Sequence, residues 1–250
     1  MELSKRLQAV ADLLSEGMRV ADIGCDHGFL SIYLVESGKS PACIALDVNK
    51  GPLERAREHI DRQRLSTYIE TRLSNGACGL RFTETEKNRR LEVEAAVLAG
   101  MGGKLMIRLV EESLDKFCAM QEFILQPQSE IAQVRSFLRQ KGFGITAEDM
   151  VLEEGKFYPI MKVEAGKGRP CPESAGERER QELYDCFGEH LLTQKHPVLR
   201  QFLEREKALY EGILEELGRQ NTIKAMHRRQ EVEERIRKTV QGLEWFKDEM

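Results

Sequence analysis

The stretch that most constrains the fold runs from Val20 to Leu30 and reads Val-Ala-Asp-Ile-Gly-Cys-Asp-His-Gly-Phe-Leu. An apolar run meets an acid at Asp22, and Gly24 and Gly28 follow before an apolar-periodic segment begins. The pattern predicts a strand, a tight turn and a helix, because glycine allows the positive φ angles of such a turn and lets a ligand approach the backbone. Since the N-terminus of the helix also offers unpaired N–H groups, the stretch predicts a nucleotide cradle.

Two carboxylates distinguish this turn from the Gly-x-Gly-x-x-Gly pattern of dehydrogenases, which binds a pyrophosphate. Asp22 precedes the turn and Asp26 lies inside it. Carboxylates repel a pyrophosphate but suit a cation, such as the sulfonium and amino groups of S-adenosylmethionine. Asp26 is placed to hold the methionine amino group or to lie near a transferred methyl group. An Asx-turn aspartate with no such role is the alternative.

Segments typical of strands and helices alternate from residue 17 onward. Strands are expected at 17–23, 43–47, 68–73, 93–99 and 122–126. Helices are expected at 28–37, 52–63, from 103 to about 114, and at 131–140. Two further strands, 145–153 and 156–164, read as a hairpin joined at Glu154-Gly155. The sequence therefore predicts an α/β fold of the Rossmann-like kind, a doubly wound and mostly parallel sheet with an antiparallel terminal hairpin.

The composition changes near residue 165, where glycines and prolines cluster and the apolar periodicity ends. Beyond it, apolar residues at near three- and four-residue spacing predict two long amphipathic helices joined by a short loop, a coiled-coil-like α-helical hairpin. We expect three parts: an S-adenosylmethionine-binding domain at 1–165, a linker at 166–176 and the helical hairpin domain at 177–250.

The net charge and the cysteine content limit which nucleic-acid, metal and membrane partners the chain is expected to have. The net charge of −4 gives no global sign of nucleic-acid binding, so any RNA contact must be a local basic patch. No two of the six cysteines lie at metal-ligand spacing, so no metal is expected, and scattered cysteines fit free thiols in a reducing cytoplasm. No apolar run is long enough to span a membrane. We expect a cytoplasmic protein without a membrane partner, and the oligomeric state stays open.

The basic patch that fits best is the segment 224–238, which has six basic and three acidic residues and a net charge of +3. An RNA backbone would be contacted there by Lys224, Arg228 and Arg229. The alternative is an ion-paired, solvated helix face.

Ligands of open α/β sheets bind outside the carboxyl ends of the strands. Asp47 ends the second strand, 19 positions beyond Gly28, where an acid grips ribose hydroxyls in nucleotide-binding units. It would serve NAD equally well, and a helix-capping aspartate is the alternative. The residues expected to bind the cofactor are Asp22, Gly24, Cys25, Asp26, Gly28, Asp47, Val48, Asn49, Asn75, Gly76, Ala77, Ala99, Gly100 and Met101.

Two of these segments have further alternatives. Asn75 is placed to hydrogen-bond an adenine edge, although an Asn-Gly turn needs no ligand. The loop Ala99-Gly-Met-Gly-Gly exposes much backbone and would lie flush against a flat ligand, or it simply starts a helix.

Several motifs together resemble the bacterial tRNA (adenine-N1)-methyltransferases that act at tRNA position 22, the TrmK family. They are Ala21–Leu30, Asp47–Leu53, Ala99–Gly103, Leu125–Gln128 and Leu152–Ile160. The resemblance spans residues 1 to about 164 and implies a class I methyltransferase fold, S-adenosylmethionine as donor and an adenine of tRNA as acceptor. Phe29 stands where the family often has tyrosine, and Asn75 where it often has an acid.

N1 of adenine carries an in-plane lone pair, so catalysis would rest on aligning N1, carbon and sulfur. Asp26 would stabilise the cation that develops on the base, and His27 would orient the base. A paired adenine must first be exposed, for example by flipping. The pocket that receives it would be lined by Phe29, Gly102, Gly103, Gln126, Pro127, Gln128 and Tyr158.

Three other functions compete with this interpretation. A methyltransferase with a protein or small-molecule acceptor would share the same cofactor motifs. A non-catalytic cofactor-binding module would use the helical tail to recruit a partner. An NAD dehydrogenase is disfavoured by the absent Gly-x-Gly-x-x-Gly pattern.

Overall fold

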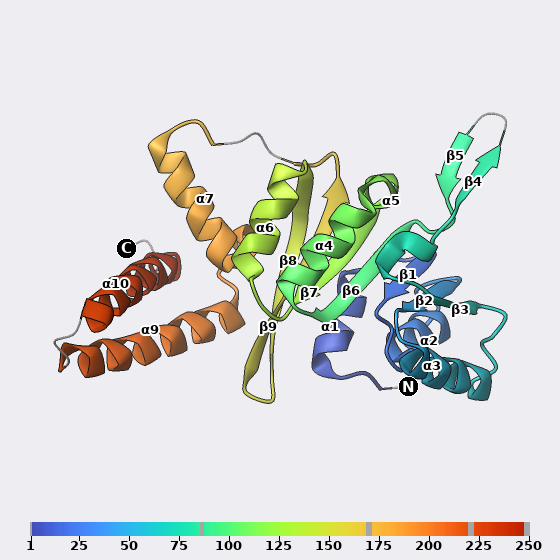
Figure 1. The fold of residues 1–250 in the computed structure, drawn as a ribbon, viewed down its shortest axis with the longest axis horizontal. Helices are drawn as coiled ribbons and strands as arrows, with labels where there is room; N and C mark the ends of the chain where they lie inside the picture. Colours follow the sequence, from blue (N-terminus) through green and yellow to red (C-terminus); the bar gives the residue numbers. More distant parts are fainter. Residues whose placement is uncertain (1, 86–87, 169–171, 220–222, 248–250) are drawn as a thin grey trace. The chain divides into compact units, whose positions relative to one another are not determined.

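The computed structural model describes residues 2–85, 88–168, 172–219 and 223–247 (Figure 1). The chain forms two compact units, Met1–Cys171 and Pro172–Met250. The first is an α/β unit and the second is helical. Among the described residues, no helix combines the length and apolar character needed to cross a membrane.

The first unit is built on a seven-stranded sheet in the order β3-β2-β1-β6-β7-β9-β8. Its strands are β1 (Val20–Ile23), β2 (Cys43–Asp47), β3 (Ile69–Leu73), β6 (Ala95–Met101), β7 (Glu122–Pro127), β8 (Phe143–Glu153) and β9 (Lys156–Ala165). The first five are parallel, while β9 pairs antiparallel with both β7 and β8. The predicted doubly wound sheet with an antiparallel terminal hairpin is confirmed. Because the strand order reverses between β1 and β6, their carboxyl ends form the expected switch point.

Helices cover both faces of this sheet (Figure 1). The residues of β2 and β6 alternate between two apolar cores, as the period of two in a strand requires. One core contains residues of α1 (Lys5–Leu13), α2 (Phe29–Glu36) and α3 (Lys50–Arg62). The other contains residues of α4 (Gly103–Glu112), α5 (Leu114–Ala119) and α6 (Ile131–Gln140). Both faces are therefore apolar, which explains the nearly continuous apolar runs of the central strands.

Two short elements and a hairpin were not predicted. They are the 3-10 turn η1 (Gly76–Gly79), the helix α5, and the two-stranded hairpin of β4 (Phe82–Thr85) and β5 (Asn88–Leu91). The hairpin extends away from the sheet (Figure 1), and its residues include Thr83, Glu84, Arg89 and Arg90. Such a polar segment has no core-facing alternation, so hydrophobic periodicity could not reveal it.

The second unit contains α7 (Ala175–Phe187), α8 (Glu189–Thr193), α9 (Pro197–Gly218) and α10 (Ile223–Glu244). The helices α9 and α10 are the two long amphipathic helices that the sequence predicts, and α7 and α8 were not foreseen. Helix α7 begins at Ala175, inside the predicted linker 166–176, because Ser174 and Glu177 form a capping box there.

Candidate functional site

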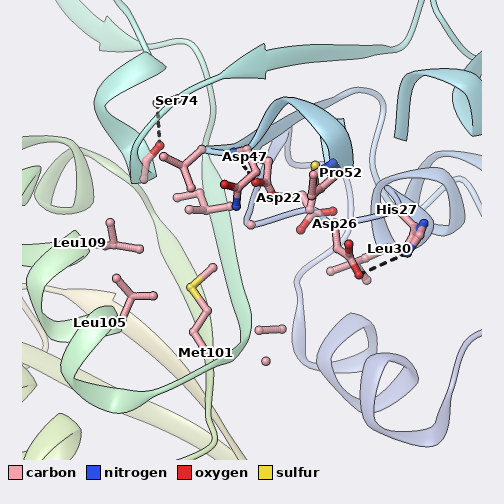
Figure 2. Close-up of a pocket in the computed structure, with 18 of the residues that line it drawn as sticks. Asp22, Asp26, His27, Leu30, Asp47, Pro52, Ser74, Met101, Leu105 and Leu109 are labelled. Carbon is pink, nitrogen blue, oxygen red and sulfur yellow. Dashed lines mark hydrogen bonds and ion pairs between the residues drawn. The ribbon is translucent and has the colours of Figure 1, made fainter. Parts of the chain in front are cut away.

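A cavity of about 620 Å³ opens at the carboxyl ends of the parallel strands (Figure 2). Its wall contains residues of the four segments that the sequence predicts at strand ends, 22–28, 47–49, 75–77 and 99–103. The predicted residues that line it are Asp22, Gly24, Cys25, Asp26, His27, Phe29, Asp47, Val48, Asn49, Asn75, Gly76, Ala99, Gly100, Met101 and Gln128.

The turn after β1 is held in a strained shape by its neighbour β2. Gly24 and Cys25 both donate backbone hydrogen bonds to Leu46 O, at 2.7 and 3.0 Å. Gly24 has a φ of 77° and Asp26 a φ of 48°. A non-glycine residue in the left-handed region costs conformational energy, and such residues gather at functional sites. Five non-glycine residues of the described chain have a positive φ, and Asp26 is the one of them that lines the cavity.

Asp22 is buried at the base of the cavity, and Ser31 Oγ donates a hydrogen bond to its Oδ2 at 2.8 Å. Burial raises the pKa of Asp22 to about 6, the Ser31 hydrogen bonds oppose that rise, and the charge of Asp47 adds to it. Burial, together with the charges of Asp22 and Asp47, also raises the pKa of the Cys25 thiol well above its ordinary value. Cys25 therefore stays a neutral wall residue rather than a nucleophile.

Asp47 satisfies both interpretations that the sequence left open. Its Oδ1 accepts a hydrogen bond from the backbone N–H of Asn49 at 2.8 Å, as in an Asx turn. The side chain also lines the cavity, and its other oxygen has no hydrogen-bond partner among the described residues. One carboxylate oxygen thus shapes the turn and the other is available to a ligand.

On the far side of β2, Asn75 and Gly76 line the cavity with Leu105 and Leu109 of α4. Asn75 Nδ2 donates to Glu112 Oε2 at 3.2 Å, which fixes the amide. In Figure 2 the two leucines lie across the cavity from Asp26 and His27. This end of the cavity combines an apolar wall with an amide, as an adenine ring requires.

The carboxyl end of β6 packs against the turn after β1. A Cβ atom added at Gly24 would lie 2.1 Å from Met101 Cε, so a larger residue there would displace the end of the methionine side chain. Gly100, with a φ of 77°, donates its backbone N–H to Gln126 Oε1 at 3.0 Å. Gly24 and Gly100 are both favoured by their positive φ angles, which other residues rarely adopt.

The rim beside Asp26 is aromatic. The rings of His27, Phe29 and His59 are nearly parallel, with centroids 5.1 to 5.8 Å apart, and Phe29 is 39% exposed. His27 Nε2 lies 3.6 Å from Asp26 Oδ2, and Arg55 Nη2 lies 4.0 Å from Asp26 Oδ1. A flat, partly exposed aromatic surface next to a carboxylate is suited to stacking a nucleobase.

Some predicted residues lie behind the wall rather than in it. Gly28 packs α2 on α3, since an added Cβ would lie 3.1 Å from Ala56 Cβ. Gly103 approaches the backbone of Ser129, where an added Cβ would lie 2.4 Å from the carbonyl oxygen. The remaining predicted residues outside the lining are Ala77, Gly102, Gln126, Pro127 and Tyr158.

Ala77 and Gln126 are absent from the lining because both are fully buried. Tyr158 lies under the guanidinium of Arg6, 5.5 Å from Cζ to the ring centroid. Arg6 itself lines the cavity, and sequence reasoning missed it because no motif marks it on its helix. The other lining residues that were missed are Leu7, Ile23, Leu30, Pro52, Ser74, Leu105, Arg108 and Leu109.

The three cations expected to contact RNA lie on α10 in the second unit. Lys224 is exposed, Arg228 Nη1 pairs with Glu231 at 2.7 Å, and Arg229 Nη2 donates to Leu217 O at 3.3 Å. Farther along the helix, Arg237 and Lys238 pair with glutamates. The ion-paired interpretation thus describes much of this helix.

The chain matches the methyltransferase-domain family over residues 3–161. It is 29% identical over 225 residues to the tRNA (adenine(22)-N(1))-methyltransferase of Bacillus subtilis, covering 85% of this chain and 86% of that protein. It is 34% identical to Sp1610 of Streptococcus pneumoniae, whose structure contains S-adenosyl-L-methionine; the TM-score is 0.79, and the match covers 97% of this chain and 100% of that one. The chain belongs to the TrmK family. The solved structure of B. subtilis TrmK agrees, with 26% identity, a TM-score of 0.78 and coverage of 97% and 99%.

Membership in the TrmK family fits the chemistry of the cavity. The buried acid Asp22 and the open oxygen of Asp47 match a ligand with a cationic end and a ribose. The apolar wall at Leu105 and Leu109 matches a purine. The residues present therefore fit S-adenosylmethionine.

Proposed function

We propose that this chain transfers the methyl group of S-adenosylmethionine to N1 of the adenine at position 22 of tRNA. The proposal rests on the turn that contains Asp22 and Asp26. This turn lines a cavity large enough for a nucleotide, and the exposed ring of Phe29 lies at the rim of the same cavity. Membership in the TrmK family supports the acceptor.

The cavity offers a separate contact to each part of the cofactor. Asp47 would accept hydrogen bonds from the ribose hydroxyls through its open oxygen. Asn75 and the two leucines of α4 would hold the adenine. Asp22 and Asp26 would face the cationic end, where carboxylates balance the sulfonium and amino charges.

S-adenosylmethionine supplies an electrophilic methyl group carried by a sulfonium. Because N1 of adenine needs no deprotonation, the residues of the chain act mainly by holding the acceptor in line with that methyl group. Phe29 stacks on the flipped base and His27 orients it. The carboxylate of Asp26 stabilises the positive charge that develops on the base as the bond forms.

The helical unit is assigned to the tRNA body. We expect Lys224, Arg228 and Arg229 on α10 to contact phosphates, and we place the reaction in the cytoplasm because its acceptor is tRNA. The ion pair of Arg228 would exchange Glu231 for a phosphate when RNA binds.

Mass spectrometry of nucleosides tests the proposal. The protein is incubated with S-adenosylmethionine and a tRNA transcript that has adenine at position 22, and with a matched transcript that has guanine there. N1-methyladenosine is expected only with the first transcript. N6-methyladenosine, or radiolabelled methyl transfer to protein or small molecules instead of tRNA, would favour a rival acceptor.

A further inference from the structure

Arg55 of α3 lies outside the cavity lining but reaches the rim of the cavity. Its Nη2 lies 4.0 Å from Oδ1 of Asp26, and the side chains of Arg55 and Asp26 are 50% and 67% exposed. Because the contact is long and open to water, the ion pair is weak. Within the described residues, Arg55 has no other ion pair and no side-chain hydrogen bond. The N–H donors of its guanidinium are therefore available at the rim.

The face of α3 that carries Arg55 is turned toward the aromatic rim. His59 follows Arg55 by four positions, so the two side chains lie on the same side of the helix. His59 Nδ1 donates a hydrogen bond to His27 O at 3.0 Å. The ring of His59 lies 5.1 Å from that of Phe29, with an angle of 15° between the ring planes. These contacts fix this face of α3 beside the surface that is suited to stacking a nucleobase.

The other two arginines of α3 contact residues that do not line the cavity. Arg57 Nε donates a hydrogen bond to Thr71 Oγ1 of β3 at 3.2 Å. Arg62 Nη2 donates to Glu58 Oε2 at 3.3 Å, one turn earlier on the same helix. Arg55 is therefore the arginine of α3 whose contact places it at the rim.

A nucleotide whose base stacks on Phe29 brings its phosphates to the same rim. The base has to point toward the methyl group, while the charged backbone stays outside the cavity in water. The exposed carboxylate of Asp26 would repel a phosphate there unless a cation lies between them. The planar fork of a guanidinium matches two phosphate oxygens at once. Arg55 has the required charge and lies beside Asp26 on the outer side of the cavity.

We propose that Arg55 binds a phosphate that flanks the target adenosine of the tRNA. When tRNA binds, the guanidinium exchanges its weak contact with Asp26 for that phosphate. The carboxylate of Asp26 is then free to face the base that receives the methyl group. The inference rests on the proposed function and adds a phosphate contact in the first unit to those expected on α10.

A tRNA with one neutral phosphate tests the assignment in the full-length protein. A methylphosphonate linkage is placed either on the 5′ or on the 3′ side of adenosine 22, and binding is measured by filter assay with S-adenosylhomocysteine present. One of the two linkages should weaken wild-type binding by about 10-fold, as expected for the loss of a charge-assisted hydrogen bond. Arg55→Gln should weaken the unmodified tRNA by the same factor and show no further loss with that linkage.

Three controls accompany this measurement. Arg62→Gln removes a paired, exposed cation from the same helix and should keep the full wild-type response to the linkage. Arg55→Lys keeps the positive charge and should retain most of the tRNA affinity. Calorimetry should give Arg55→Gln the affinity of the wild type for S-adenosylhomocysteine, because Arg55 does not line the cavity.

An unchanged tRNA affinity in Arg55→Gln would overturn the assignment. So would losses that add up when the variant meets either linkage, or a loss of S-adenosylhomocysteine affinity as large as the loss for tRNA. Slower methyl transfer with unchanged tRNA affinity would also overturn it, since Arg55 would then act only on Asp26. A wild type that methylates no tRNA would refute the proposed function together with this inference. Any of the earlier results with a wild type that methylates adenosine 22 would refute the role of Arg55 alone.

Discussion

Ser31 Oγ donates a hydrogen bond to Asp22 Oδ2 at 2.8 Å, and both side chains are buried under the turn after β1. Burial nevertheless raises the pKa of Asp22 to about 6. The carboxyl group that would face the cofactor's cationic end therefore titrates close to physiological pH. Binding a cation beside it should favour its charged form and release a proton.

Cofactor affinity should consequently depend on pH. Because the cation binds the deprotonated form of Asp22, the affinity for S-adenosylmethionine should rise with pH by up to about tenfold per pH unit and level off above about 6. Calorimetry between pH 5 and 8 checks this, and Asp22→Asn should flatten the profile while Asp115→Asn on the exposed face of α5 should not. A profile that kept its slope in Asp22→Asn would contradict the assignment of the titration to Asp22.

The same carboxyl group should limit the stability of the unliganded protein. Its pKa is about 6 when folded against 3.8 as the ordinary value, so the folded state binds more protons between these values. Stability should therefore fall as pH rises from about 4 to 6, by an amount on the order of 3 kcal/mol. Asp22→Asn, which keeps an acceptor for Ser31, should remove this loss in denaturant unfolding at pH 7. Equal stabilities of the two proteins at pH 7 would contradict it.

Asp26→Asn tests the carboxylate at the rim without disturbing the backbone, since asparagine tolerates the left-handed region. The rate of methyl transfer to tRNA should fall by roughly 100-fold, which is the usual effect in other enzymes of removing one group that stabilises charge in the transition state. Single-turnover assays with saturating cofactor measure this rate. An unchanged rate together with unchanged cofactor affinity would remove Asp26 from the mechanism.

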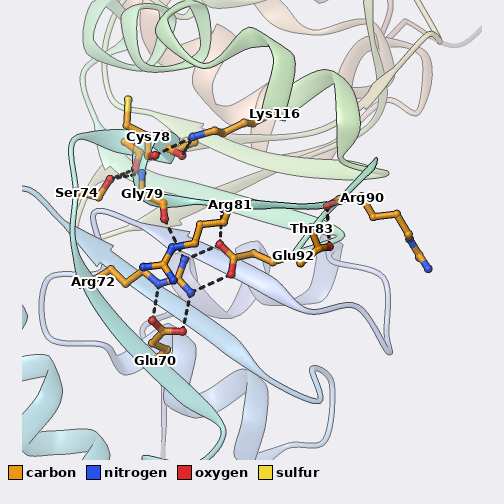
Figure 3. A network of polar contacts seen from close by, with 12 residues as sticks. Glu70, Arg72, Ser74, Cys78, Gly79, Arg81, Thr83, Arg90, Glu92 and Lys116 are labelled. Carbon is orange, nitrogen blue, oxygen red and sulfur yellow. Dashed lines mark hydrogen bonds and ion pairs between the residues drawn. The ribbon is translucent and has the colours of Figure 1, made fainter. Parts of the chain in front are cut away.

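Arg72 ties the segment before η1 to the base of the β4–β5 hairpin (Figure 3). Its Nη2 contacts Glu70 Oε2 at 2.7 Å and Glu92 Oε2 at 2.9 Å, and its Nη1 donates to Gly79 O at 3.0 Å. The Arg72 hydrogen bond lowers the pKa of Glu70. For Glu92 burial acts in the opposite direction, but the hydrogen bonds from Arg72 and Arg81 prevail and lower the pKa. Charged forms of both glutamates are thus favoured by folding.

Arg72→Met should therefore destabilise the protein by about 1–3 kcal/mol at pH 7, since Glu92 would lose its charged partner and keep only the backbone N–H of Arg81. Folded-state pKa values below the ordinary 4.5 mean that the stabilisation is present above that pH and is lost as pH falls below it. The difference in melting temperature between Arg72→Met and the wild type should therefore become smaller as the pH falls below 4.5. Arg90→Met on the exposed part of the hairpin is the control, and an equal loss in that variant would contradict the role of Arg72.

Replacing Lys224, Arg228 and Arg229 together with glutamine should weaken tRNA binding and make it less dependent on salt. The slope of log affinity against log salt should decrease by roughly 1 for each phosphate contact removed. Filter binding at several salt concentrations measures both quantities. Arg237→Gln combined with Lys238→Gln removes two paired cations from the same helix and should have a smaller effect. Equal losses from both variants would indicate a general effect of charge.

What the sequence could predict depended on short-range patterns. Asp22, Asp47 and Ala99 are found at the cavity because each lies in the last part of an apolar parallel strand, and parallel strands bring their carboxyl ends together. Arg6 reaches the site through a contact with Gln126, 120 positions away, which no local pattern reports. Gln126 and Tyr158 do not line the cavity, and their assignment to the pocket that receives the base stays a prediction.

Gln126 has one carbonyl oxygen for two donors, the N–H of Gly100 and the guanidinium of Arg6. A change at position 126 therefore removes one hydrogen bond from Gly100 and another from Arg6 at once. Replacing both residues should accordingly harm the protein less than the two single losses added together.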